Sequence, residues 1–128
     1  MRRSPFLQDL SRDHHTALSL ANRIAKAVGE PALADLMRLV PEDFRCRMEP
    51  HFRLEEEELL VRLAQAGEAS LVRRTLAEHR LLRDLAARVA GGDRAALKDF
   101  GLALRDHVRF EERELFVAAE ARLETGPA

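Results

Sequence analysis

Two stretches of the chain repeat a histidine that is followed four residues later by a glutamate. The pairs are His51 with Glu55 and His107 with Glu111, and six of the ten positions that start at each histidine are identical. On an α-helix, residues four apart project from one face about one turn apart. Each pair therefore presents an imidazole and a carboxylate together, which is a ready chelate for a metal ion.

A lone histidine precedes each pair at a matching place. His14 follows Asp13, and His79 follows Glu78. With these matches the chain is a duplicated two-helix hairpin, each half of which supplies one lone histidine and one pair. His15 is an alternative to His14, but the repeat and the apolar series both favour His14 and leave His15 at the rim.

The elements that must position these residues are expected to be helices. Ala, Leu, Arg and Glu dominate, and no run alternates with period two over the length of a strand. The 128 residues suit a single domain. Short connections between long amphipathic helices favour an all-α, up-down-up-down antiparallel four-helix bundle. The expected helices span residues 5–28, 32–66, 69–90 and 93–123, with 124–128 as a tail.

Two prolines, Pro41 and Pro50, lie inside the second expected helix. A proline in a helix removes a backbone donor and clashes with the carbonyl one turn earlier. We therefore expect a short helix to about Val40, followed by a kinked helix.

Four histidines and two glutamates fall within the apolar series of their helices and are expected to point into the bundle. They are His14, His51, Glu55, His79, His107 and Glu111. Unpaired buried carboxylates are unfavourable by several kcal/mol, and bound cations remove this penalty. Nitrogen and carboxylate ligands suit iron or manganese better than structural zinc. Six side chains exceed one mononuclear site with an open position, so we expect two metals, bridged by Glu55 and Glu111, with two histidines on each. Without metal, these glutamates are expected to take up protons or admit water.

The neighbours of these residues are assigned to the surface or the core. Glu58 and Glu114 follow His51 and His107 by seven residues. Two roles stay open for them: hydrogen-bond acceptor beside the site, or solvated surface residue. Glu56 and Glu112 are expected to face solvent. Cys46 is expected to be a small packed side chain.

Charge and cysteine content exclude several functions. The 21 Lys and Arg nearly balance the 22 Asp and Glu, and the signs are interleaved, which argues against nucleic-acid binding and a polybasic membrane surface. One cysteine cannot form an internal disulfide or a cysteine-rich metal site. No apolar h-region and no stretch of about 18 apolar residues occurs. We expect a cytoplasmic protein.

The pattern of six residues on four successive helices resembles the hemerythrin-like, or HHE cation-binding, family. Pro50-His51-Phe52 and the glutamates that follow are similar to the family's usual sequence in its second helix. The resemblance extends from about Leu7 to Leu123. The resemblance implies a four-helix bundle around a non-haem di-iron centre. It also implies which residues bind: Glu55 and Glu111 as bridges, and His14, His51, His79 and His107 as terminal ligands.

The sequence departs from oxygen-carrying hemerythrins at two places. Those proteins have another histidine one turn before the position of His79, where this chain has Thr75, and they space the last carboxylate five residues after its histidine, where this chain has Glu111 at four. The departure favours sensing or redox turnover over reversible oxygen storage.

The resemblance thus implies a protein with two non-haem iron ions, for which manganese or zinc can substitute. It would bind oxygen, nitric oxide or peroxide for iron, redox or oxygen sensing or a stress response, and a sensor would signal through an unidentified protein partner. The alternative is a di-iron enzyme that turns over peroxide or nitric oxide. A metal-free helical interaction domain is a third reading, which the inward Glu55 and Glu111 disfavour.

Overall fold

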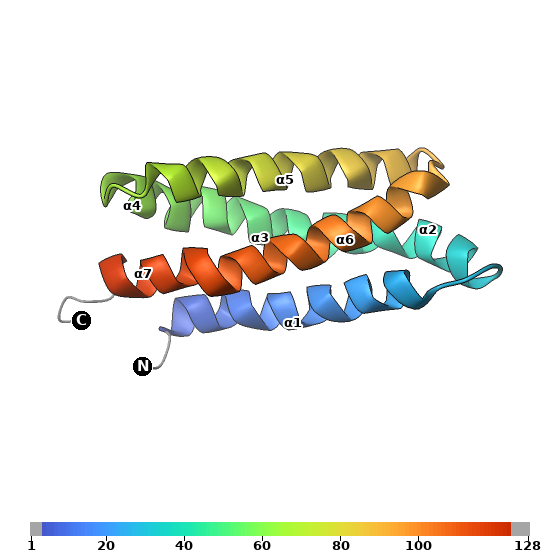
Figure 1. The fold of residues 1–128 in the computed structure, drawn as a ribbon, viewed down its shortest axis with the longest axis horizontal. Helices are drawn as coiled ribbons and strands as arrows, with labels where there is room; N and C mark the ends of the chain where they lie inside the picture. Colours follow the sequence, from blue (N-terminus) through green and yellow to red (C-terminus); the bar gives the residue numbers. More distant parts are fainter. Residues whose placement is uncertain (1–3, 124–128) are drawn as a thin grey trace.

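The structure is a computed structural model that describes residues 4–123, all of whose long segments are helical (Figure 1). Four helical rods follow one another with short connections, which confirms the expected up-down-up-down bundle. The first rod is α1 (Pro5–Lys26) and the third is α5 (Ala69–Ala90). The second consists of α2 (Ala32–Asp43), η1 (Phe44–Met48), α3 (Glu49–Leu54), η2 (Glu55–Leu59) and α4 (Leu60–Gln65). The fourth consists of α6 (Arg94–Phe110), η3 (Glu111–Leu115) and α7 (Phe116–Leu123).

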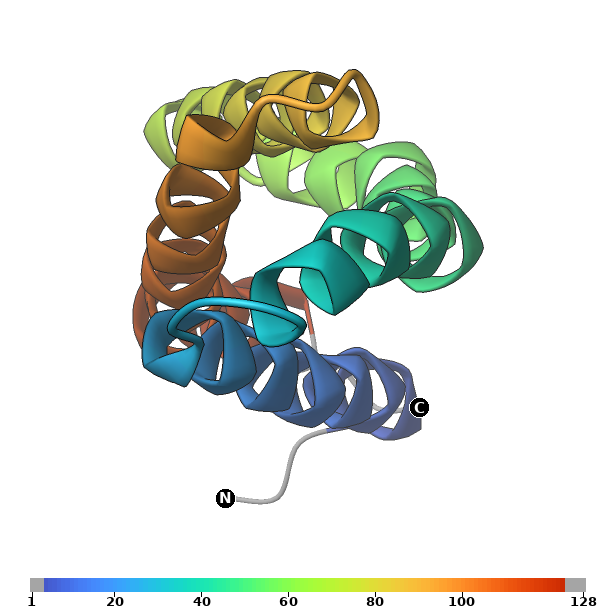
Figure 2. The ribbon, with the colours of Figure 1, turned by 90° about the vertical axis from the view of Figure 1, so that its right-hand side faces the viewer.

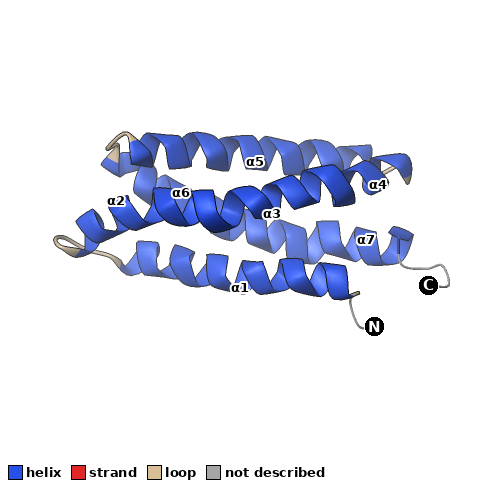
Figure 3. Ribbon diagram, turned by 180° about the vertical axis from the view of Figure 1, so that it is seen from behind, coloured by secondary structure: helices blue, strands red, loops and turns tan. Residues whose placement is uncertain are grey.

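The rods surround a common axis, which is clearest from the end of the bundle (Figure 2). α6 packs against both α1 and α5, and α2 packs against α5. Seen from behind, the helices of residues 4–123 run side by side with only short loops between them (Figure 3). No helix in this part of the chain is long and apolar enough to cross a membrane.

Side-chain caps fix where two of the rods begin. The Ser4 hydroxyl accepts a hydrogen bond from the Leu7 amide, with Pro5 at the first helical position. Asp93 accepts in the same way from the Ala96 amide at the start of α6. α1 ends earlier than expected, at Lys26, and Val28 is 88% exposed.

The second rod stays helical through both prolines, and α2 ends at Asp43, shortly after the expected end at about Val40. α2 runs past Pro41 to Asp43, and η1 follows at once as a π-helical turn, in which the Glu49 amide donates to the Phe44 carbonyl five residues back. A proline ring in an α-helix meets the carbonyl of the fourth residue before it. The wider turn of η1 lies directly before Pro50, where it makes room for this ring.

The other two π-helical turns, η2 and η3, lie at equivalent places in the two halves of the repeat. η2 begins at Glu55 and η3 at Glu111, and in each the amide after the turn donates back to that glutamate's carbonyl. Single π-helical turns inside α-helices are frequent at functional sites. Both glutamates of the expected site therefore start a local widening of their helix.

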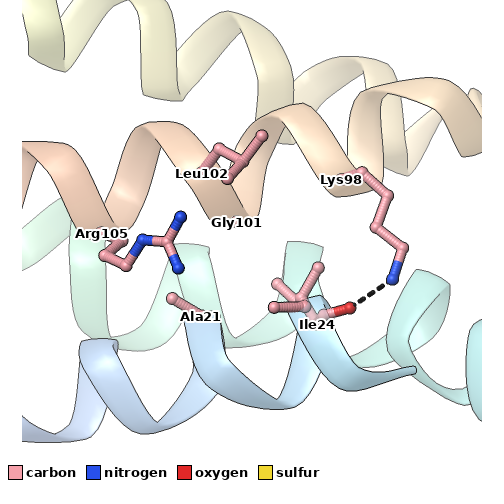
Figure 4. A pocket seen from close by; sticks show the side chains of 7 residues that line it. Ala21, Ile24, Lys98, Gly101, Leu102 and Arg105 are labelled. Atoms are coloured by element: carbon pink, nitrogen blue, oxygen red, sulfur yellow. Dashed lines mark hydrogen bonds between the residues drawn. The ribbon is translucent and has the colours of Figure 1, made fainter.

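α1 and α6 approach each other closely at Gly101. A Cβ atom there would lie 2.9 Å from Cγ2 of Ile24. Beside this contact is a cavity of about 230 Å³ between the two helices (Figure 4). Lys98 lies at one end, where it donates to the Ile24 and Ala27 carbonyls that end α1. None of the six expected site residues lines this cavity.

Candidate metal centre

A polar layer divides the core of the bundle into two apolar clusters. In α1, His14 lies between Leu10 of one cluster and Ala17 of the other. In α5, His79 lies between Leu82 of one cluster and Leu76, which packs against the other. The histidine and glutamate positions are thus buried at mid-length in the bundle, enclosed by apolar side chains at both ends.

The structure brings all six expected residues into this layer, each at most 3% exposed. Thr75 is the only other buried polar residue within 4–123, and its hydroxyl donates to the Leu71 carbonyl at 2.7 Å. His15, by contrast, is exposed. The fold therefore places His14, and not His15, beside the other site residues.

The Nε2 atoms of the four histidines converge on the two glutamates. Nε2 of His14 lies 2.7 Å from Oε1 of Glu111, and Nε2 of His107 lies 3.1 Å from Oε2 of the same carboxylate. Nε2 of His79 lies 3.0 Å from Oε1 of Glu55, and Nε2 of His51 lies 3.1 Å from Oε2. Each carboxylate therefore stands between two imidazoles that come from different rods.

These side chains form two groups, each compact enough to hold a metal ion. The first consists of His14, His51, Glu55 and Glu111, and the second of Glu55, His79, His107 and Glu111, with ligand atoms within 4.8 Å of one another in each group. The two groups share both glutamates. Both glutamates are therefore candidate ligands in either group.

A second ring of carboxylates holds the other nitrogen of every imidazole. The pairs of Nδ1 and carboxylate oxygen are His14 with Glu112 at 2.7 Å, His51 with Asp13 at 3.0 Å, His79 with Glu56 at 2.6 Å and His107 with Glu78 at 2.6 Å. An acceptor at Nδ1 fixes the ring orientation and tautomer and makes Nε2 a stronger ligand. All four Nε2 atoms are thereby directed at the glutamates of the layer.

The expectation that Glu56 and Glu112 face solvent is therefore wrong. Each follows a site glutamate by one residue, lies at the boundary between two rods and is only partly exposed, so that its carboxylate reaches the histidine of the neighbouring rod. Asp13 and Glu78 have the same role, which was not expected from the sequence. The repeat carried the signal, since both acidic pairs, Asp13 with Glu78 and Glu56 with Glu112, occupy equivalent positions.

The remaining neighbours lie at the surface. Glu58 and Glu114 are exposed, and Glu114 forms an ion pair with Arg74. Cys46 is exposed, with its thiol 3.7 Å from a Glu42 carboxylate oxygen, so the expectation of a packed side chain is wrong. Its place on the outside of η1 explains the difference, because the inward positions of this turn are taken by Phe44 and Met48.

The carboxylates make these histidines strong bases in the metal-free protein. Burial opposes the charge on His51, but its contacts with Glu111 and Glu55 outweigh this and raise its pKa to about 11. Burial likewise opposes the charge on His107, and the negative charge of Glu111 raises its pKa to about 10. The pKa values of His14 and His79 are raised as well, for the same reason.

The charged imidazoles around Glu111 favour its ionised form, contrary to the expectation that this glutamate takes up a proton. Burial alone would raise the pKa of Glu111, but the positive charge of His107 and the contacts with His14 and His51 hold that pKa well below its ordinary value. The carboxylate stays ionised, as a metal ligand must be. Metal binding then has to displace protons from the histidines.

Four buried atoms in the layer face one another as two ion pairs, each 3.1 Å apart, but make no hydrogen bond of good geometry. They are Nε2 of His51, Nε2 of His107, Oε2 of Glu55 and Oε2 of Glu111. Buried polar atoms are rarely left without partners. These four belong to good ligands for iron, manganese or zinc, and a cation beside them would satisfy all four, so the donor set fits a metal.

A helical bundle that carries two histidine and carboxylate groups in its core defines a class of metal-binding four-helix proteins. The family model of the hemerythrin HHE cation-binding domain matches residues 6–119. The chain therefore belongs to the hemerythrin family of HHE cation-binding domains. No curated protein and no solved structure matches it significantly.

Proposed function

We propose that the chain binds two iron ions in the polar layer and uses them to bind oxygen, nitric oxide or peroxide in iron, redox or oxygen sensing. His14 and His51 would hold one ion, His79 and His107 the other, and Glu55 and Glu111 both. The observation that carries the proposal is the set of four buried atoms that make no hydrogen bond, which lie on two carboxylates and two imidazoles of the shared groups.

Bound iron supplies one-electron redox chemistry and a coordination position for a small ligand. The chain contributes the surroundings. The two apolar clusters keep bulk water from the layer, and the outer carboxylates hold the imidazoles in place. At the position where oxygen carriers have a further histidine, Thr75 is buried and its hydroxyl is bonded to Leu71. This absence of a further imidazole supports ligand sensing over oxygen storage.

Iron content tests the proposal directly. Protein produced with iron supplied is expected to hold about two iron ions per chain, one for each residue group. It should also show near-ultraviolet charge-transfer absorption, which Tyr and Trp, absent here, cannot obscure. Less than one metal ion per chain would contradict the proposal. Glu111→Ala should lose the iron, and Glu114→Ala, which removes an exposed carboxylate, should keep it.

The reactions of the reduced protein with oxygen, nitric oxide and peroxide then distinguish a sensor from an oxygen carrier and from an enzyme. A sensor should be oxidised by oxygen and should change its spectrum with nitric oxide. Oxygen that can be pumped off while the iron stays ferrous would indicate a carrier, and many turnovers with peroxide would indicate an enzyme. Cytoplasmic location and an unidentified protein partner stay predictions from the sequence.

A further inference from the structure

Arg83 of α5 donates hydrogen bonds to Glu56, the carboxylate that contacts Nδ1 of His79. Its Nη1 donates to Oε2 of Glu56 at 2.8 Å, and that same oxygen lies 2.6 Å from Nδ1 of His79. Its Nη2 also reaches Oε1 of Glu56 at 3.2 Å. One carboxylate oxygen is therefore shared between a guanidinium and a site histidine.

Further contacts fix the position of Arg83. Its Nε and Nη2 donate to the two oxygens of Glu49, both at 2.8 Å, as a bidentate pair. Its guanidinium lies 5.5 Å from the centre of the Phe52 ring, and that ring stacks on His79 with centroids 3.8 Å apart. Arg83 thus reaches His79 along two routes, a hydrogen-bonded one through Glu56 and a stacked one through Phe52.

The first half of the repeat has no arginine at the equivalent position. Alignment of His14 with His79 places Leu18 opposite Arg83, and Leu18 packs against an apolar cluster. The two halves place their histidines and glutamates alike but differ here. Arg83 is therefore not needed to build the shared geometry, and its contacts serve the half that contains His79.

The direction of its effect follows from simple electrostatics. A carboxylate that accepts from Nδ1 increases the negative charge on an imidazole and makes Nε2 a stronger donor to metal. A guanidinium on the same oxygen draws negative charge toward itself. The histidine then becomes a weaker donor, which favours the ferrous over the ferric state of a bound iron.

We propose that Arg83 is a positioning residue that acts through Glu56 to weaken His79 as a ligand and so raises the reduction potential of the iron bound there. The inference rests on the di-iron function proposed above. It assigns to Arg83 an influence on the reduction potential of the iron that the shared arrangement of histidines and glutamates does not provide.

Two variants should shift the potential in opposite directions. Arg83→Met removes the charge and keeps an unbranched chain over Phe52, so it should favour ferric iron about tenfold, which is about 59 mV lower for one electron. Glu56→Gln replaces the carboxylate with a weaker, neutral acceptor and should raise the same potential. Arg83→Lys keeps the charge and should stay closer to the unaltered protein than Arg83→Met.

The measurement is a mediated spectroelectrochemical titration of iron-loaded protein whose iron has been counted beforehand. Arg53→Met is the matched control, because Arg53 is exposed and contacts the same Glu49 at 3.6 Å, and it should leave both potentials unchanged. Two irons per chain with unchanged potentials in Arg83→Met, or shifts of the same sign in Arg83→Met and Glu56→Gln, would overturn the proposal. Loss of iron from Arg83→Met would show a purely structural role and overturn it too. Less than one iron in the unaltered protein would instead overturn the di-iron function.

Discussion

Oε1 of Glu111 lies 2.7 Å from Nε2 of His14, and this contact joins the last helical rod to the first across the core. The contact is buried on both sides. His15 is the next residue in the chain but points out to the surface. The two adjacent histidines therefore differ in their expected effect on metal binding.

His14→Ala should lower metal affinity by about tenfold or more, because the loss of a direct ligand should at least match the loss of an outer partner. His15→Ala should leave the affinity unchanged. The measurement is metal content after loading and desalting, followed by competition with a chelator. Equal losses in the two variants would show that His14 is not a ligand.

Glu112→Ala should lower metal affinity by about 10-fold to 100-fold, since it removes the acceptor at Nδ1 of His14. Glu57→Ala is the control, because Glu57 is an exposed member of the other acidic run. Chelator competition checks both. If Glu112→Ala binds metal as tightly as Glu57→Ala does, the outer carboxylates do not support the site.

The metal-free protein should lose stability as the pH rises. The pKa values of His51 and His107 are raised from 6.5 to about 11 and about 10, so their contribution to stability is complete below pH 6.5 and is lost as the pH passes through those values. The lowered pKa of Glu111 gives a contribution that is complete above pH 4.5 and is lost only at lower pH. Thermal unfolding of chelator-treated protein should therefore show the highest melting temperature between pH 4.5 and 6.5.

Iron-loaded protein is the comparison for this experiment. Bound metal replaces the imidazole protons, so at pH 8 the loaded form should melt well above the metal-free form. A metal-free protein whose melting temperature increases from pH 6.5 to pH 10 would contradict the assignment of protons to the histidines.

Gly101→Ala should destabilise the fold by about 1–3 kcal/mol, because the new methyl group would lie 2.9 Å from Ile24 and the two helices would have to shift. Gly91→Ala is the control, since its added Cβ meets only ordinary contacts at 3.5 Å. Urea unfolding gives both values. Ile24→Val combined with Gly101→Ala should recover part of the loss if the clash is the cause.

Much of the fold followed from the sequence because helical periodicity and the internal repeat carry it. The same two signals singled out the six residues that the structure brings into one buried layer. A residue type that recurs at the same helical phase in both halves of a repeat indicates a shared inward-facing position. The prolines predicted a local irregularity in the second rod, but the sequence could not show that it takes the form of a π-helical turn directly before Pro50.

The outer contacts of the site could not be derived from the phase of a single helix. Glu56 and Glu112 lie about 100° around the helix from the inward direction, where a solvated position is the usual result. Their carboxylates are nevertheless long enough to reach a histidine on the next rod. Arg83 was missed for the same reason, because its contacts depend on which rods are neighbours and how they are turned.

The π-helical turns also distinguish what the two halves of the repeat share from what only one of them has. A π-helical turn holds one residue more than the α-helix around it, and η2 and η3 occupy equivalent positions in the two halves. Their matching positions make the local widening a feature that both halves of the repeat share. η1 has no counterpart, since residues 100–104 are ordinary α-helix and Asp106 stands opposite Pro50. That turn therefore belongs to the first hairpin alone, where it lies directly before Pro50.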